Sequence, residues 1–454
     1  MNKIPRSTIP HAYALETVPR YTSYPTAAQF GPDTTEADYR RWLSELTPDQ
    51  PLSLYVHVPY CRVLCWYCGC HMSVLNDDAR IARYARRLEK EATLLAQATP
   101  HAGKVKHLHF GGGTPTILAP EDFEALVAHL RSLFRFEEDA EIAVEIDPRT
   151  LAPEMARALA RAGVNRVSLG VQDIDPGVQA LVNRVQPLEQ VAATVAALRE
   201  VGITRINVDL MYGLPTQTVE HVRASIAAVL ELGIERAAVF GYAHVPWFKK
   251  HQTAIDATLL PGATERLAQA QAAADAFAEA GWESVGFDHY AHPGDPIARA
   301  AREGNLNRNF QGYTTDEAEI LLGLGASSIG SLPQGYVQNE PHLGKWAQAI
   351  DADRLAVVRG TGIDDEDRLR RDVIMQLMSN FEVDLEREAI AHGLERDHFD
   401  EALESLATLA TDGLCTIDGR ILTVTPQARL FVRNVAARLD AYWAPSPGRH
   451  SLAV

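Results

Sequence analysis

Four of the five cysteines in this chain lie within ten residues, in the stretch CRVLCWYCGC from Cys61 to Cys70. Cys61, Cys65 and Cys68 have the spacing C-x3-C-x2-C, whereas the fifth cysteine, Cys415, is remote in the sequence. In a reducing compartment, clustered cysteines are more often metal ligands or redox groups than structural disulfides. The stretch therefore predicts a metal or redox site near the beginning of the chain.

Two kinds of metal site compete for these thiols. A structural zinc site usually takes its ligands from two separated segments, and here all the thiols belong to one loop. An iron–sulfur cluster takes its thiolates from compact loops of this kind. Three cysteine ligands for four irons would leave one iron open to chemistry. The spacing favours the cluster and leaves zinc as the alternative.

The elements that must position this loop follow a regular rhythm. Runs rich in β-branched and apolar residues predict six strands, and segments with a helical pattern separate them. In one of these segments Pro153 suits a first helical turn and Gly163 supplies a stop. The predicted strands are residues 52–59, 105–112, 140–148, 166–173, 205–213 and 236–244. The fold class that this pattern predicts is α/β, an open partial (β/α)6 barrel.

Polar residues or glycines end every predicted strand. In parallel α/β folds the chemistry lies at the carboxyl ends of the strands, so these residues predict one shared site. For any one of them, capping of the following helix is an equally good interpretation. The residues are Tyr55 and His57, Gly111 to Pro115, Glu145 and Asp147, Gln172 and Asp173, Asp209 and Tyr212, and Tyr242 and His244.

The sequence pattern changes beyond about residue 365. Helical patterns are followed by a predicted hairpin that turns at Asp418 and Gly419, and then by a last helical pattern. The expected organisation is an N-terminal arm over the active site (1–50), the partial barrel (51–360) and a smaller, mainly helical, winged-helix-like domain (361–454). Winged-helix folds often bind DNA, but in an acidic chain a lid or docking role is favoured.

Composition limits the partners of the 454-residue chain. Its formal net charge of −16 argues against a general surface for nucleic acid or for an anionic membrane. The first residues lack the apolar core of a signal peptide, and no later run is apolar enough to span a bilayer. We therefore expect a cytoplasmic protein. Because no apolar stripe is left unassigned, a monomer is favoured.

The cysteine spacing with an aromatic residue before its last member, CRVLCWYC, resembles the radical S-adenosylmethionine (SAM) superfamily, and GGGTP resembles the SAM-binding glycine motif of that superfamily. Further motifs appear in an order similar to that of the oxygen-independent coproporphyrinogen III oxidases. They are PRYTSYPT, the extra cysteine Cys70, EIDPR, GVQD, NVDLMYGLP, YAH and NRNFQGYTT.

This resemblance implies two cofactors and their ligands. Cys61, Cys65 and Cys68 would ligate a [4Fe-4S] cluster, whose fourth iron would be chelated by the amino and carboxylate groups of SAM; Cys70 would not be a ligand. The residues implied to contact this SAM are Tyr55, Gly112, Glu145 and Ile329. A second SAM would contact Tyr67, Gly113, Thr114, Gln172, Arg184, Asp209 and Ala243.

The implied reaction is the oxidative decarboxylation of two propionates of coproporphyrinogen III to vinyl groups, giving protoporphyrinogen IX through a 5′-deoxyadenosyl radical. It requires an electron donor for the cluster and an electron acceptor. His57 and Tyr242 are candidate catalytic groups, although a strand-end histidine is more often structural. Arg20 and Arg308 are candidates for binding propionates.

Two other functions remain open at this stage. Haem-chaperone and ring-opening relatives share the cysteine motif and GGGTP, but the chaperone-like forms lack the C-x-C extension and the PRYTSYPT arm. A non-catalytic protein that binds a cluster or zinc is the alternative from another class, and it leaves the functionalised strand ends unexplained.

Overall fold

The computed structural model describes residues 9–444, and these residues form two compact units. The first unit contains the chain up to Ala28, Leu210–Thr315 and the chain from Ile363 onward. The second unit contains Gln29–Asp209 and Asp316–Gly362. The ends of the N-terminal arm and of the C-terminal domain that the sequence predicts, residues 1–8 and 445–454, lie outside the described residues.

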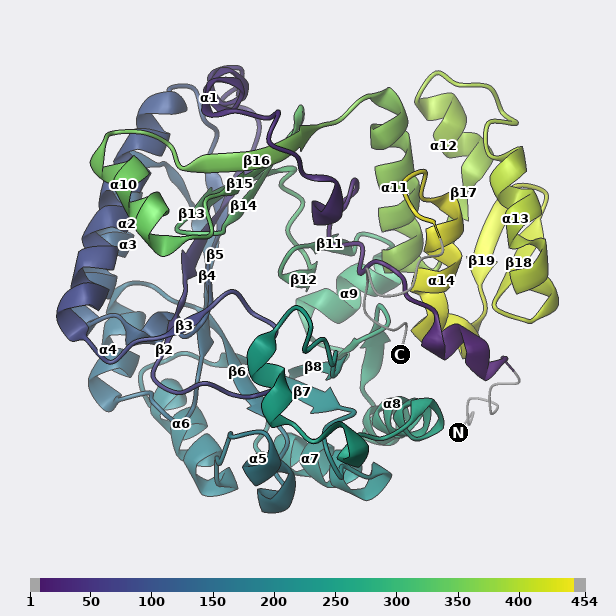
Figure 1. The fold of residues 1–454 in the computed structure, drawn as a ribbon, viewed down its shortest axis with the longest axis horizontal. Helices are drawn as coiled ribbons and strands as arrows, with labels where there is room; N and C mark the ends of the chain where they lie inside the picture. The colour runs from purple at the N-terminus through teal and green to yellow at the C-terminus, as the bar shows by residue number, and fades with distance from the viewer. Residues whose placement is uncertain (1–8, 445–454) are drawn as a thin grey trace. The chain divides into compact units, whose positions relative to one another are not determined.

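The second unit is built on the parallel strands that the sequence predicts (Figure 1). Strands β1, β4, β5 and β6 pair in parallel in this order, and β13 pairs in parallel with the other edge of β1. Strands β14, β15 and β16 continue this edge in antiparallel fashion. The bounds are β1 Leu52–Val58, β4 Val105–Gly112, β5 Phe136–Ile146, β6 Arg166–Gln172, β7 Arg205–Tyr212, β13 Ile320–Leu324, β14 Ile329–Leu332, β15 Gly335–Asn339 and β16 Val357–Gly362.

Helices follow the parallel strands along the chain, as the sequence predicts. Pro153 occupies the first turn of α4, and Gly163 with φ +86° follows its end, since a left-handed residue there suits glycine. Figure 1 shows α2, α3 and α4 outside the strands, and neighbouring members of this series contact one another. The bounds are α1 Glu36–Ser44, α2 Asp78–Ala98, α3 Pro120–Leu133, α4 Pro153–Arg161, α5 Pro176–Leu181, α6 Leu188–Glu200 and α10 Leu343–Asp351.

The sixth predicted strand belongs to the first unit as β8, where it pairs with β10 in antiparallel fashion. The full strand order is β16-β15-β14-β13-β1-β4-β5-β6-β7-β8-β10-β9, so the sheet is open at β16 and β9. The six β/α repeats and the open sheet confirm the predicted fold class. The further bounds are β8 Arg236–Gly241, β9 Glu283–Val285, β10 His289–Ala291, β11 Asn307–Asn309, β12 Gly312–Thr314, α7 Val219–Glu231, α8 Ala263–Glu279 and α9 Pro296–Glu303.

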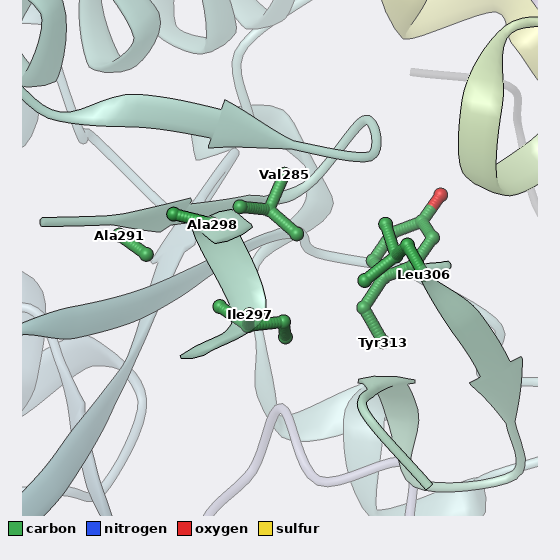
Figure 2. Close-up of a cluster of buried hydrophobic side chains, with 6 residues drawn as sticks. All are labelled: Val285, Ala291, Ile297, Ala298, Leu306 and Tyr313. Carbon is green, nitrogen blue, oxygen red and sulfur yellow. The ribbon is translucent and has the colours of Figure 1, made fainter. Parts of the chain in front are cut away.

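A buried apolar cluster holds β9, β10, α9 and the β11–β12 hairpin together. Figure 2 shows its six side chains, with Leu306 and Tyr313 beside each other at one end. Phe287 packs against the same cluster. Tyr313 also donates a hydrogen bond of 2.6 Å from its hydroxyl to the carbonyl of Met378, which ties the hairpin to α11 (Asp365–Asn380).

The C-terminal part of the first unit is mainly helical, as predicted. A three-stranded sheet, β17-β19-β18, accompanies its helices. The predicted hairpin is present, but Asp418 pairs with Ile421, so the turn lies at Gly419 and Arg420 and begins one residue later than predicted. The last helical pattern, 426–443, is broken into short turns around α14. The bounds are α12 Leu385–Ala391, α13 Asp400–Thr411, α14 Val432–Ala436, β17 Glu382–Asp384, β18 Cys415–Asp418 and β19 Ile421–Val424.

The described start of the chain packs on this C-terminal part within the first unit. The buried Tyr21 donates its hydroxyl to Asp440 at 3.0 Å. Asn434 donates to the carbonyl of Tyr13 at 3.0 Å, and Arg438 pairs with Glu16 at 2.8 Å. Residues 13–21 and residues 434–440 therefore stabilise each other. Among the described residues, no helix is long and apolar enough to cross a bilayer.

Candidate active site

The cysteine loop leaves the second unit's sheet at the carboxyl end of β1 and is held at both of its ends. Strand β2 (Tyr60–Cys61) pairs with β3 (Ser73–Val74). Further hydrogen bonds join the loop to the segment after β6: Trp66 N–H donates to the carbonyl of Val182 at 3.0 Å, and the Asn183 amide donates to the carbonyl of Leu64 at 2.7 Å. Cys65 is buried, Cys61 and Cys68 are half-buried and Cys70 is exposed.

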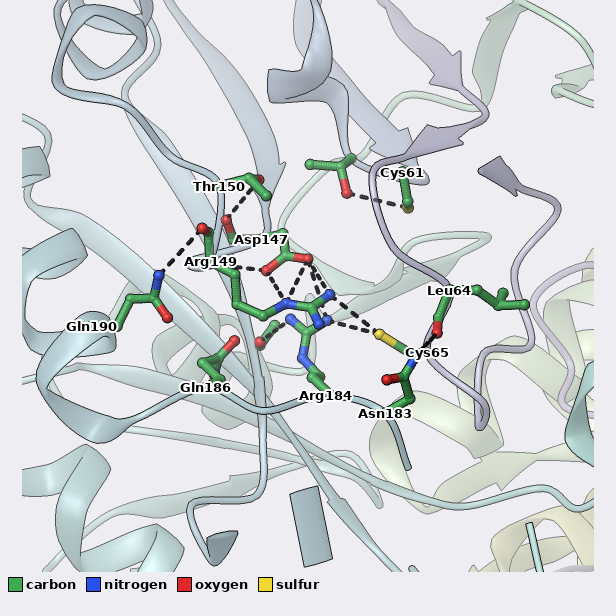
Figure 3. Close-up of polar contacts among 12 residues, drawn as sticks. Cys61, Leu64, Cys65, Asp147, Arg149, Thr150, Asn183, Arg184, Gln186 and Gln190 are labelled. Carbon is green, nitrogen blue, oxygen red and sulfur yellow. Dashed lines mark hydrogen bonds and ion pairs between the residues drawn. The ribbon is translucent and has the colours of Figure 1, made fainter. Parts of the chain in front are cut away.

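Two arginines donate to the sulfur of Cys65 (Figure 3). Nη2 of Arg149 lies 3.3 Å from this Sγ, and Nη1 of Arg184 lies 3.4 Å from it. Arg149 also holds both carboxylate oxygens of Asp147, at 3.0 Å through Nε and at 2.7 Å through Nη2. Burial pushes the pKa of Asp147 upward, but the hydrogen bond from Arg149 and the charge of Arg184 outweigh burial and lower it. Two cationic donors therefore converge on the sulfur of Cys65.

Burial disfavours the thiolate form of Cys61, which is the form that binds a metal. Burial raises the pKa of Cys61 to about 12, even though Thr114 Oγ1 donates to its sulfur at 3.3 Å. Such a thiol stays protonated at neutral pH unless a metal cation replaces the proton. Among the residues that the structure describes, no three His, Cys, Asp or Glu side chains are grouped to hold a single metal ion. The assignment of Cys61, Cys65 and Cys68 as ligands stays a prediction.

The glycines that follow β4 have no room for a side chain. A Cβ on Gly112 would lie 2.4 Å from Cε1 of His57, and its φ of +113° also disfavours other residues. A Cβ on Gly113 would lie 2.6 Å from the carbonyl oxygen of Tyr60. Thr114 N–H donates to this same oxygen at 2.8 Å. The segment therefore brings bare backbone close to β1 and the cysteine loop, which is the property that a cofactor-binding glycine segment needs.

Four side chains of β1, β4 and β5 form a connected group. Nδ1 of His57 lies 3.0 Å from the Tyr55 hydroxyl, and Nε2 lies 3.0 Å from the carbonyl of His71. Tyr55 stacks on His109, whose Nε2 lies 3.4 Å from Oε1 of Glu145. Burial lowers the pKa of His57 to about 4. Since both its nitrogens have protein partners, the geometry favours the structural interpretation of this ring.

Glu145 also accepts the backbone N–H of Gly112 at 3.0 Å. Burial raises its pKa, but the hydrogen bond and charge of His109 and the N–H of Gly112 outweigh burial, so the pKa is lowered. The carboxylate is therefore ionised at neutral pH. It is suited to accept hydrogen bonds from an ammonium group.

Asp209, at the end of β7, behaves differently from Glu145. Burial and the charge of Glu145 raise its pKa to about 7, while Ser168 Oγ donates to both of its oxygens at 3.3 Å. Gln172 and Arg184 both flank Gly170, where a Cβ would lie 3.0 Å and 2.9 Å from their nitrogens. The charges of Glu145 and Arg184 therefore both act on Asp209, and Gln172 lies with Arg184 beside Gly170.

Tyr67 and Ile329 complete the predicted residues of the second unit. Burial raises the pKa of Tyr67 well above its usual value, and the nearest charges acting on it are those of Arg184, Cys65 and Cys68. Ile329 begins β14, and its carbonyl would lie 2.9 Å from a Cβ on Gly323, the residue that pairs with Tyr55.

The remaining predicted residues belong to the first unit. The hydroxyl of Tyr242 forms a hydrogen bond of 2.8 Å with Nδ1 of His244. The carbonyl of Tyr242 accepts a hydrogen bond from Nη1 of Arg266 at 2.8 Å. The carbonyl of Ala243 accepts the Gln252 amide at 3.2 Å. Arg20 and Arg308 also lie in this unit.

Arg149, His109 and Ser168 contact the predicted site residues, although none of them is a predicted strand-end residue. Asp147 was expected only as a strand-end polar residue, and Arg149 was noted only as part of the motif EIDPR; together they reach Cys65. His109 and Ser168 were missed because they lie inside β4 and β6, before the strand ends. A signal for both was available, since an alternating strand places His109 on the same face as Gly111, and Ser168 on the same face as Gln172.

Comparison with known proteins assigns this chain to a superfamily and, within it, to a family. The sequence model of the Radical SAM superfamily matches residues 55–229, and that of the HemN C-terminal domain matches residues 363–431. An oxygen-independent coproporphyrinogen III oxidase from Bradyrhizobium diazoefficiens is 50% identical over 449 residues, which are 99% of this chain and 100% of the relative. The protein of the same name from Escherichia coli is 41% identical and covers 93% of both chains.

The three-dimensional comparison agrees. The structure of coproporphyrinogen III oxidase (HemN) from Escherichia coli, described as a radical SAM enzyme, superposes with a TM-score of 0.89 at 40% identity, covering 93% of this chain and 98% of that one. The chain belongs to the family of oxygen-independent coproporphyrinogen III oxidases.

Proposed function

We propose that this protein is a radical SAM oxidoreductase that converts coproporphyrinogen III to protoporphyrinogen IX without oxygen. The observation that carries the proposal is the group of residues around Cys65, where a three-cysteine loop, two arginine donors and a glycine segment meet. The relatives that cover nearly the whole chain bear the name of this activity. Neither a haem chaperone nor a ring-opening enzyme is supported by them.

Cys61, Cys65 and Cys68 would hold a [4Fe-4S] cluster, and SAM would bind beside it. When bound, these two groups supply a one-electron cleavage of SAM and the radical that takes a hydrogen atom from a propionate. Loss of CO₂ with one further electron, which an external acceptor must take, leaves the vinyl group. The electron donor, the acceptor, the monomeric state and the cytoplasmic location stay predictions.

The chain's own residues have distinct tasks in this proposal. Tyr55, Gly112, Glu145 and Ile329 would bind the SAM at the cluster, with the ionised Glu145 accepting from its ammonium group. Tyr67, Gly113, Thr114, Gln172, Arg184, Asp209 and Ala243 would bind the second SAM. Arg149 and Arg184 keep cationic donors on Cys65. Cys65 is buried, so the cysteine loop would limit the access of water to the radical.

An anaerobic assay tests the proposal. Reconstituted, reduced protein receives SAM and coproporphyrinogen III, and the products are identified by mass spectrometry. We expect protoporphyrinogen IX, 5′-deoxyadenosine and methionine, all lost in Cys65→Ser. The matched control is Cys415→Ser, because Cys415 is buried in β18 of the other unit and should be dispensable for the reaction. Cleavage of SAM without loss of CO₂ would move the activity to another substrate.

A further inference from the structure

Three arginines from distant parts of the chain act on one another inside the first unit. Arg20 belongs to the N-terminal segment, Arg308 to β11 and Arg433 to α14. Burial, followed by the charges of Arg20 and Arg308, lowers the pKa of Arg433 to about 10. A guanidinium group is ordinarily protonated at any physiological pH, so this shift reflects crowding of like charges in a buried place.

Arg308 is the most informative of the three. Only 5% of its side chain is exposed, and its Nε and Nη1 have no hydrogen-bond partner. The carboxylate of Asp288 is 3.9 Å from Nη1, beyond hydrogen-bonding distance. Two buried cationic donors thus lack an acceptor. Such donors cost the folded protein free energy unless a ligand supplies the missing acceptors.

Asp288 does not balance the cluster. Its Oδ1 already accepts Nδ1 of His289 at 2.6 Å. The charge of Asp288 raises the pKa of Arg433, but burial and the charges of Arg20 and Arg308 outweigh it. Arg308 and Arg433 are buried and Arg308 has donors without acceptors, so an anion is favoured beside them even in a chain with a net charge of −16.

Aromatic rings hold the guanidinium groups in place. Cζ of Arg308 lies 4.5 Å from the ring centre of Tyr313 and 5.0 Å from that of Phe287, and Cζ of Arg433 lies 5.8 Å from the ring centre of Phe287. Tyr313 belongs to the buried cluster in Figure 2, and Phe287 packs against this cluster. The cationic groups are therefore fixed before any ligand arrives, which lowers the entropy lost on binding.

We propose that Arg20, Arg308 and Arg433 form a carboxylate-binding site for one propionate group of the tetrapyrrole substrate. This inference rests on the proposed function and names the residues that recognise the substrate. A planar guanidinium group matches the two oxygens of a carboxylate, and a propionate supplies the acceptors that Arg308 lacks. Arg20 is the exposed member, so the carboxylate enters from its side.

Equilibrium binding to the reconstituted protein with SAM tests the site. The probes are coproporphyrin III, which is fluorescent and carries four carboxylates, and its tetramethyl ester, which carries none. Arg20→Gln, Arg308→Gln and Arg433→Gln should each raise the Kd for coproporphyrin III at least ten-fold. The ester should bind weakly to the wild type and equally weakly to the variants. Arg302→Gln is the control, because Arg302 forms an exposed ion pair with Glu283 in the same unit.

The outcomes distinguish failure of the proposed carboxylate site from failure of the proposed function. A wild-type protein that converts coproporphyrinogen III, together with Kd values within two-fold of each other for all three variants, overturns the site and leaves the proposed function standing. A wild-type protein that neither binds coproporphyrin III nor converts coproporphyrinogen III overturns both. Arg308 and Arg433 are buried, so circular dichroism checks that their variants fold. Arg20→Gln, at an exposed position, decides the outcome if they do not, and an unchanged Kd in Arg20→Gln would then refute the site.

Discussion

At the residue scale, the glycines of the candidate site leave no space for a larger side chain. Gly111 illustrates this as well as Gly112 does, because a Cβ there would lie 2.8 Å from Oε1 of Glu145. Cys65 receives its two arginine donors from segments that follow different strands. Small changes in such a place displace several neighbours at once, since a packed interior does not deform gradually.

Gly112→Ala should therefore impair the binding of SAM more than it impairs folding. The new Cβ would lie 2.4 Å from the His57 ring, at a φ of +113° that alanine rarely adopts. We expect an affinity for SAM at least ten-fold lower, measured by equilibrium dialysis with reconstituted protein. The control is Gly202→Ala, which has a φ of +89° but no heavy atom within 4 Å. Equal affinities in the two variants would show that the clash with His57 does not matter.

Contacts between residues that are far apart in the chain could not be predicted from the sequence. GGGTP and the cysteine spacing can each be recognised within a short stretch of sequence. In the structure the two segments contact each other through Thr114 and Cys61. The contact between Arg149 and Cys65 joins residues 84 positions apart, and no local pattern contains it.

At the scale of elements, the six strands could be predicted because β-branched and apolar runs recur between helical segments with clear stops such as Gly163. The last helical pattern could not be placed correctly. Residues 426–439 pack against the N-terminal segment through Asn434 and Arg438, and such long-range contacts override the local preference. The hairpin turn lies at Gly419 and Arg420 because Gly419 adopts a φ of +60°, which suits a two-residue turn, while Asp418 stays in the strand and pairs with Ile421.

Glu91 couples helix α2 to the segment between β13 and β14. Its Oε2 accepts the N–H of Gly325 at 2.6 Å, and Oε1 accepts from Asn339 at 2.8 Å and Trp346 at 3.2 Å. Only 2% of the residue is exposed, and burial raises its pKa to about 7 despite these three donors. This segment leads directly into Ile329, a predicted contact of SAM.

Glu91→Gln should destabilise this connection. The amide would turn an NH₂ group toward an existing donor, which leaves buried N–H groups unsatisfied and costs about 1–3 kcal/mol of unfolding free energy. Urea denaturation measures this loss, and Glu89→Gln on the same helix is the control. We also expect a higher Kd for SAM, since the start of β14 loses its anchor. A stability equal to that of the control would mean that the three hydrogen bonds contribute nothing net.

At the scale of the whole molecule, His57 should make stability depend on pH. Burial lowers the folded-state pKa of His57 to about 4, against an ordinary value of 6.5 in the unfolded chain. Below pH 6.5 the unfolded chain binds a proton that the folded chain does not bind, so the contribution of this group to the unfolding free energy is full above pH 6.5 and decreases as the pH falls toward 4. Between pH 7 and pH 5 the loss amounts to about 2 kcal/mol.

His57→Gln isolates this effect, because glutamine does not titrate and can both accept from the Tyr55 hydroxyl and donate to the carbonyl of His71. The difference in unfolding free energy between wild type and variant should shift by about 2 kcal/mol in favour of the variant when urea denaturation is repeated at pH 5 instead of pH 7. The other titrating groups cancel in this difference. His101→Gln, at an exposed histidine, should show no such shift. If His57→Gln also shows none, the ring is protonated as easily in the folded chain as in the unfolded one, and the tight packing of His57 against Gly112 cannot be what keeps it neutral.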